Sequence, residues 1–439
     1  MTSVWRWLCH HRAPVSRLLL VFLTLYVTTL LLFHMPSLVR RGASVTLPDD
    51  VSVDDVISGL WNYDPGPLQY LPRSCRPLRD VAFIKCMKCA TETLGTVFRR
   101  YAYLRNLTVL LPREKKIYLG WPYQMTPLDY QPTSLHGDRF NLLMEHAIYN
   151  GSFMRRVMNP GTAFVTMIRE PLDHFVSTLN YFNVFEIANV STRHGMKAVQ
   201  TYLRNIEYYE QVYKSSAAST KRYCIPDGFS VTKNLLSHCL GMPLGFPEGS
   251  ADISDNVDAV GRYIRAVDSE FLLVMIMEYF EESLVLLKRM MCWGTKDIIY
   301  HSTNSGSYRK NISWHLLTPH DRQLHKEWSK VDYIVYRHFN RTFWAKVRQQ
   351  GEDFALEVQH FKRVQKQVTW FCNTVIAYGD SYIRIPESPW SPAFNFSSSD
   401  CQLMAAPLLV MLQQQHKQRE PNLKAVNFSG HPRKLKPLC

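Results

Sequence analysis

Two lysines, Lys85 and Lys88, stand in a short segment that also carries the hydroxyl residues Thr91 and Thr93. The segment joins an apolar run to a stretch with helical spacing. A helix N-terminus offers unpaired N–H groups and the positive end of the helix dipole, so these side chains would favour a phosphate or a sulfate there. The nucleotide triphosphatase signature G-x-x-x-x-G-K-[ST] is absent. Taken alone, the segment fits an anion site and an ordinary helix start, with Thr91 as N-cap and two solvated lysines, equally well.

A second segment favours the anion site. Arg169 directly follows the apolar run 162–168, and Ser177 comes eight residues later in a stretch of helical type. An arginine at the carboxyl end of a strand and a serine on the next helix can hold one phosphate through charge-assisted hydrogen bonds and a hydroxyl. Ligands of open α/β sheets bind at that edge. The two segments together predict one ligand with two separated anionic groups.

The elements that must position these residues follow from the apolar patterning. Short apolar runs typical of buried strands alternate with stretches of helical spacing, which predicts a parallel sheet flanked by helices, the α/β class. The tail after about residue 347 has weaker patterning. The predicted strands lie at 80–85, 140–144, 162–168 and 271–277, and the clearest helices at 91–103 and 281–291.

The first forty residues predict a membrane anchor. Residues 18–39 carry no formal charge and are long enough to cross a bilayer as a helix. Three arginines precede them, which by the positive-inside tendency leaves the N-terminus in the cytosol. A cleaved signal peptide is less favoured, because no small-x-small site follows the long apolar run. We therefore expect a cytosolic tail (1–17), one transmembrane signal-anchor (18–39), a stem (40–78), a folded domain (79–347) and a C-terminal extension (348–439).

Composition agrees with a lumenal body. The formal charge of +14 predicts attraction to something anionic, and nine of the ten cysteines would lie in the lumen, where disulfides can form. This placement argues against nucleic acid as a partner, and the sequence gives no oligomeric state. Seven Asn-x-Ser/Thr sequons support the same placement: Asn106, Asn150, Asn189, Asn311, Asn340, Asn395 and Asn427.

The two anion-binding segments resemble motifs of the Golgi galactose 3-O-sulfotransferases, which include galactosylceramide sulfotransferase. FIKCMKCATET at 83–93 is similar to the family's F-I-K-T-H-K-T-A-S-S-T, and IREPLDHFVST at 168–178 is similar to V-R-D-P-V-x-x-F-x-S-S. The resemblance covers roughly 81–347. It implies a P-loop-like sulfotransferase fold in a Golgi type II membrane protein. Further similar stretches stand in the expected order at 106–112, 139–150, 232–236, 278–293 and 336–344.

The resemblance also implies a reaction. The donor would be 3'-phosphoadenosine 5'-phosphosulfate, with its 3'-phosphate on Arg169 and Ser177. The acceptor would be the 3-hydroxyl of a galactose on a glycolipid or glycan. Lys88 would neutralise charge on the leaving phosphate, by analogy with phosphoryl transfer, and no metal is required. The 5'-phosphosulfate would be held by Lys85, Lys88, Cys89, Ala90, Thr91 and Thr93.

One departure from the family affects the chemistry. Met87 stands where the family has a histidine between its two lysines, and methionine cannot accept a proton. Glu145 and His146 occupy the positions of a family histidine pair, and His146 is the better candidate base. Residue patterns alone favour a structural His146 and a surface Glu145. A catalytically silent relative, which binds donor or glycan as a partner protein, is therefore the alternative.

Cys86 and Cys89 form a C-x-x-C pair at the same turn. This spacing suits a thioredoxin-like redox pair or a structural disulfide across the loop. A zinc site would need a second half, which is not evident. The redox hypothesis explains neither Arg169 nor Ser177, so the structural disulfide is the preferred of the two.

Overall fold

The computed structural model describes residues 75–113, 117–191, 195–215, 225–301, 316–375 and 381–421, all within one compact unit, Asn62–Cys439. The predicted cytosolic tail, the anchor at 18–39 and nearly all of the stem lie outside these residues. Within the described ranges, no helix combines the length and apolar character needed to cross a bilayer.

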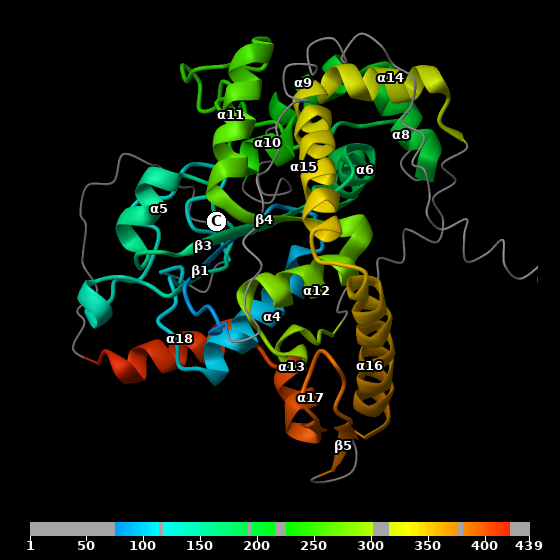
Figure 1. Cartoon of the computed structure of the whole chain (residues 1–439). Coiled ribbons are helices and arrows are strands. Elements are labelled where there is room, and N and C mark those ends of the chain that lie inside the picture. The colour runs from blue at the N-terminus through cyan, green and yellow to red at the C-terminus, as the bar shows by residue number, and fades with distance from the viewer. Residues whose placement is uncertain are drawn as a thin grey trace, which may run out of the picture. The chain divides into compact units, whose positions relative to one another are not determined.

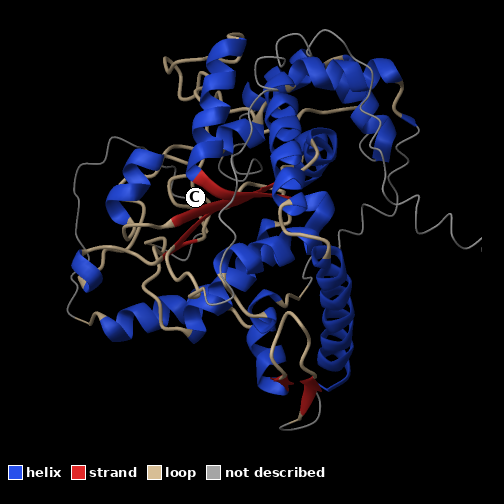
Figure 2. Ribbon diagram, in the orientation of Figure 1, coloured by secondary structure: helices blue, strands red, loops and turns tan. Residues whose placement is uncertain are grey.

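A four-stranded parallel sheet forms the centre (Figure 2), with strand order β2-β1-β3-β4. The strands are β1 (Val81–Ile84), β2 (Leu142–Leu143), β3 (Ala163–Ile168) and β4 (Phe271–Ile276). This confirms the predicted α/β class and the position of each strand. β2 is shorter than the predicted 140–144, because Phe140 leaves the sheet to pair with Met158.

Helices cover both faces of the sheet, which explains why all four β1 side chains are buried. Figure 1 shows α4 (Thr91–Leu104) and α12 (Phe280–Met291) on one side of the strands, with α11 (Val257–Glu270) and α15 (Lys330–Arg348) on the other. α6 (Pro171–Tyr181) follows β3. The predicted helices at 91–103 and 281–291 are confirmed as α4 and α12. Each follows a strand at its carboxyl end, as parallel connections require.

A second apolar cluster lies over the turn that follows β1. It joins Met87, Trp121 and Ile148 to the apolar faces of α6 and of its neighbouring helices. The remaining helices before residue 330 are α5 (Gly151–Val157), α7 (Val184–Ile187), α8 (Gly195–Arg204), α9 (Ile206–Ser215), α10 (Leu235–Cys239), α13 (Thr295–Ile298) and α14 (Pro319–Trp328), with 3-10 turns at Leu135–Gly137 and Met277–Tyr279.

The weakly patterned tail forms regular structure. Its helices are α16 (Asp353–Val375), α17 (Ser398–Ala405) and α18 (Leu408–Arg419), and β5 (Tyr382–Ile385) pairs antiparallel with β6 (Phe394–Ser397). α16 packs on α12 around a buried ion pair of 2.6 Å between Lys288 Nζ and Glu357 Oε1, while α17 and α18 pack on α4. The tail therefore contributes to the support of α4.

Candidate functional site

The turn between β1 and α4 adopts a backbone that glycine usually supplies in phosphate-binding loops. Lys88 and Ala90 have φ angles of 60° and 53°, in the left-handed region. Ala90 is the N-cap of α4, and no side chain caps the helix. Thr91 is instead the first helical residue, and its hydroxyl donates to the Cys86 carbonyl oxygen at 2.7 Å, so its predicted role as N-cap was wrong. Thr93 follows in the same turn. The helix start is thus available to an anion.

α6 lies directly against this turn, so the two predicted anion-binding segments are neighbours. Arg169 Nη1 donates to the Lys88 carbonyl oxygen at 3.3 Å, and His174 Nε2 donates to the Met87 carbonyl oxygen at 2.9 Å. The Lys88 ammonium lies 4.0 Å from the centre of the Tyr181 ring. The contacts run along α6 from its first turn to its last residue.

Ser177 belongs to the same face of α6. It lies three residues after His174 and four before Tyr181, the spacing at which helical side chains share a face. Its side chain is buried. Arg169 is also buried, and its Nε finds no hydrogen-bond partner among the described residues, while Asp173 lies 3.8 Å from Nη2. A buried guanidinium with an unused donor is suited to an anionic ligand.

Lys85 is not solvated but belongs to a balanced charge cluster with Glu92, Arg99 and Glu145. Its Nζ lies 2.6 Å from Glu92 Oε2 and 3.4 Å from Glu145 Oε2. Arg99 donates to both oxygens of Glu145, at 2.7 and 2.9 Å, and to Glu92 Oε1 at 2.7 Å. Glu145 is fully buried rather than a surface charge. Both of its oxygens are engaged by cations, so its evident task is to hold Lys85 and Arg99.

Glu92 competes with any anion for Lys85. Burial alone would raise the pKa of Glu92, but Lys85 and Arg99 lower it to about 2, so the carboxylate stays charged at neutral pH. In the motif alignment given above, the family has a serine at this position. This chain therefore places a negative charge in the first turn of the helix that would receive a phosphate.

His146 lies beside the turn with a defined tautomer. Its Nδ1 is 2.8 Å from the Lys85 carbonyl oxygen, which can only accept, so Nδ1 carries the proton and Nε2 keeps a lone pair. Burial, together with the positive charges of Lys85 and Arg99, holds the pKa of His146 well below its usual value. The imidazole is therefore neutral and keeps a lone pair on Nε2, while the lowered pKa makes it a weaker base than an exposed histidine.

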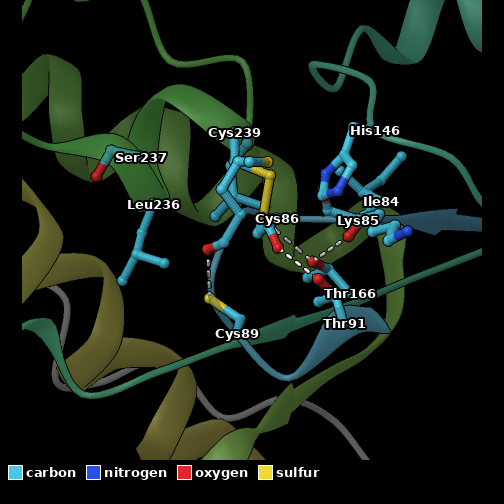
Figure 3. The surroundings of a disulfide bond; sticks show 12 residues. Ile84, Lys85, Cys86, Cys89, Thr91, His146, Thr166, Leu236, Ser237 and Cys239 are labelled. Atoms are coloured by element: carbon cyan, nitrogen blue, oxygen red, sulfur yellow. Dashed lines mark hydrogen bonds between the residues drawn. A yellow bond between two sulfur atoms is a disulfide. The ribbon is translucent and has the colours of Figure 1, made fainter. Parts of the chain in front are cut away.

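The loop cysteines do not pair with each other (Figure 3). Cys86 forms a disulfide with Cys239 of α10, and Cys89 is a buried free thiol whose Sγ lies 3.3 Å from the Met87 carbonyl oxygen. Burial raises the pKa of the Cys89 thiol, which stays protonated. Both C-x-x-C hypotheses, the redox pair and the disulfide across the loop, were therefore wrong. The bond instead ties the turn to α10.

Sequence reasoning missed Glu92, Arg99, His174, Tyr181 and Cys239. Two signals were available. Glu92 and Arg99 are seven residues apart on one helix, which is two turns and one face, and Tyr181 is four residues after Ser177. Nothing local identifies Cys239 as the partner of Cys86. Among the described residues, no group of three or more His, Cys, Asp or Glu side chains could hold a metal ion.

Comparison with known proteins identifies the family. The family model for galactose-3-O-sulfotransferase matches residues 1–394. The chain belongs to the galactose-3-O-sulfotransferase family. Its curated relatives include bovine galactose-3-O-sulfotransferase 3, 28% identical over 346 residues, which are 73% of each chain. Mouse galactosylceramide sulfotransferase is 28% identical over 301 residues, 68% of this chain and 65% of the relative.

A third relative is pig galactose-3-O-sulfotransferase 2, 28% identical over 278 residues, which cover 62% of this chain and 63% of the relative. The chain therefore spans just under two thirds of the length of two of these three galactose-3-O-sulfotransferase family members. The resemblance drawn from the two motifs is confirmed by these matches. Family membership supports a sulfotransferase activity for this chain.

Proposed function

We propose that this protein transfers a sulfuryl group from 3'-phosphoadenosine 5'-phosphosulfate to the 3-hydroxyl of a galactose on a glycolipid or glycan. The observation that carries the proposal is the contact of 3.3 Å between Arg169 Nη1 and the Lys88 carbonyl oxygen. It brings together two cationic segments that are some eighty residues apart in sequence. Such a pair of sites suits a donor with two separated anionic groups.

The residues divide between the two ends of the donor. The phosphosulfate would lie at the uncapped start of α4, held by Lys85, Lys88, Cys89, Ala90, Thr91 and Thr93. The 3'-phosphate would take the unused Arg169 Nε donor and the Ser177 hydroxyl. Lys88, whose left-handed backbone sets its side chain over α6, would neutralise the charge that develops on the leaving phosphate.

The transfer needs one proton acceptor. The acceptor hydroxyl oxygen attacks sulfur, the bond between sulfur and the 5'-phosphate oxygen breaks, and 3'-phosphoadenosine 5'-phosphate leaves with the bonding electrons. The hydroxyl proton passes to a base, for which we propose His146 through Nε2, because its Nδ1 already carries a proton. The other candidate base, Glu145, is paired with Arg99 at 2.7 Å and would position Lys85 instead.

The proposed setting is the Golgi membrane, with residues 18–39 as a signal-anchor and the body in the lumen. Three disulfides within the described residues, Cys75–Cys292, Cys86–Cys239 and Cys372–Cys401, support an oxidising compartment. The proposed division places the sulfotransferase domain at 79–347 and the extension at 348–439, whose helices pack on α4 and α12.

The test combines transfer with donor binding. The full chain is incubated with labelled donor and either galactosylceramide or a β-galactoside, and binding of 3'-phosphoadenosine 5'-phosphate is measured by calorimetry. Lys88→Ala and Arg169→Ala are expected to weaken that binding at least about tenfold, since each removes a charge-assisted contact. Lys366→Ala, an exposed lysine on α16, is the control. The absence of both sulfate transfer and donor binding would refute the proposal. Donor binding without transfer would instead support a silent relative.

A further inference from the structure

We propose that a pocket beside the turn binds the galactose end of a neutral acceptor glycan. The inference rests on the proposed sulfotransferase function and assigns the acceptor subsite of the same reaction. The pocket has a volume of about 340 Å³, within the range of small-ligand sites. Its lining includes Tyr123, Gln124, Ile148, His238, Phe246 and Ser250.

The pocket lining is connected to the candidate base and to the turn. Ile148 lies two residues after His146 in an extended segment that pairs in parallel with Tyr118 and Gln124. Residues two apart in an extended segment face the same side, so the His146 and Ile148 side chains lie on one side of this segment. His238 directly precedes Cys239, which is bonded to Cys86 in the turn. Two connections therefore tie the pocket lining to the turn that would hold the sulfuryl donor.

The pocket has no formal charge. Its lining contains no Asp, Glu, Lys or Arg. The imidazole of His238 donates from Nε2 to the Pro122 carbonyl oxygen at 2.7 Å, which leaves Nδ1 as an acceptor. Burial lowers the pKa of His238 to about 4, so the ring is neutral. The ligand that fits is uncharged, in contrast to the donor with two anionic groups that the cationic turn suits.

The walls match a sugar rather than an aliphatic ligand. The rings of Tyr123 and Phe246 lie 5.0 Å apart at 36° and form an aromatic wall, on which the C–H face of a pyranose can pack. Gln124 Oε1 accepts from Asn150 Nδ2 at 2.8 Å, which fixes the amide beside that wall. An apolar face flanked by neutral hydrogen-bonding groups complements galactose, which has one C–H face and a rim of hydroxyls.

A longer acceptor has room beyond this pocket. Gln124, Gly241 and Pro243 also line a second cavity of about 360 Å³. That cavity has polar walls, including Arg155 and Glu270, which form an ion pair of 2.8 Å. The shared lining makes the two cavities adjacent, so the sugar next to the terminal galactose can extend into the second one when Asn150, a sequon residue that also lines it, carries no glycan.

The test uses the full chain and the β-galactoside lactose as the probe. Tyr123→Ala is expected to raise the KM for lactose at least about tenfold. The kcat and the affinity for 3'-phosphoadenosine 5'-phosphate should stay within about twofold, because the aromatic wall contacts only the acceptor. Tyr208→Ala, which removes a tyrosine on α9 that is 66% exposed, is the matched control. Phe246→Leu keeps an apolar side chain and provides a second variant if Tyr123→Ala fails to fold.

Direct binding separates the acceptor subsite from the enzymatic proposal. Lactose binding is followed by saturation-transfer NMR with and without 3'-phosphoadenosine 5'-phosphate. Binding that Tyr123→Ala or Phe246→Leu abolishes supports the pocket even if no sulfate is transferred, in which case only the proposed function fails. An unchanged KM for lactose in a folded Tyr123→Ala protein would overturn the proposal that this pocket binds the acceptor. So would full lactose affinity in both variants, if both still bind donor and transfer sulfate.

Discussion

Removing the charge of Glu92 should strengthen donor binding. The carboxylate lies 2.6 Å from Lys85 Nζ, so an anion that hydrogen-bonds to the same ammonium would come within about 4–5 Å of it. At that distance two unit charges repel by about 1 kcal/mol in water and about 3–4 kcal/mol near a protein surface. Because the Glu92 side chain is 45% exposed, we take about 1–2 kcal/mol. Glu92→Gln is then expected to bind 3'-phosphoadenosine 5'-phosphate about 5–30 times more tightly.

The geometry indicates that Lys85 would stay in place in this variant. Glu145 lies 3.4 Å from Lys85 Nζ and remains paired with Arg99. The folded state should lose about 1 kcal/mol, since the ion pairs of a half-exposed carboxylate contribute little. The pKa of about 2 keeps Glu92 charged in the unmodified protein, so the difference should persist from pH 8 down to about pH 4.

The assay is titration calorimetry of both proteins at low and high salt, because an electrostatic gain shrinks as screening increases. Glu282→Gln is the matched control, since it removes an equal charge and a 2.8 Å ion pair with Lys362 at the contact between α12 and α16. Equal or weaker binding by Glu92→Gln would refute the reasoning and would mean that Glu92 orients Lys85 for the ligand.

Three further predictions concern the turn and its surroundings. Cys239→Ser should lower the free energy of unfolding by about 2–4 kcal/mol in urea titrations, because the bond to Cys86 closes a long loop; a loss no larger than that of Cys401→Ser, which opens a shorter loop, would contradict this. Met87→His should restore or raise sulfate transfer if the missing base limits turnover, at a cost of about 1–3 kcal/mol from its buried site; unchanged turnover would leave the base role to His146. Acidification from pH 7 to pH 5 should lower the melting temperature, because burial lowers the pKa of six described histidines, so the unfolded chain takes up protons below pH 6.5 that the folded protein does not. Four carboxyls whose pKa burial raises act in the opposite direction but are fewer, namely Glu170, Glu270, Glu278 and Asp332, and a melting temperature that rises would contradict this balance. The six histidines are His146, His174, His238, His325, His360 and His416.

The sequence was sufficient for the centre of the fold. β1, β3 and β4 are buried apolar runs, and α4 and α12 carry clear helical spacing, so local patterning identified each of them. The rule that parallel strands present their carboxyl ends at one edge then predicted that Arg169 would approach the turn at Lys88. The tail was missed because α17 and α18 have no distinct apolar face and are stabilised by packing on α4.

The unpredicted parts of the site depend on contacts between distant residues. Lys85 meets Glu145 across sixty positions, and Cys86 meets Cys239 across 153. No local pattern encodes such a partner, and disulfide connectivity cannot be deduced from spacing. The sequence supplied the residue types at the turn, whereas the structure shows which charges are already neutralised.

The position of α18 bears on how this protein is synthesised. α18 packs on α4, and Arg419 Nη1 donates to the Asn106 carbonyl oxygen at 3.1 Å across 313 positions. During translation, the outer surface of α4 is therefore covered only after nearly the whole polypeptide has emerged from the ribosome. A nonsense mutation just upstream of Leu408 would leave that apolar surface open to chaperones, and such a product should be degraded.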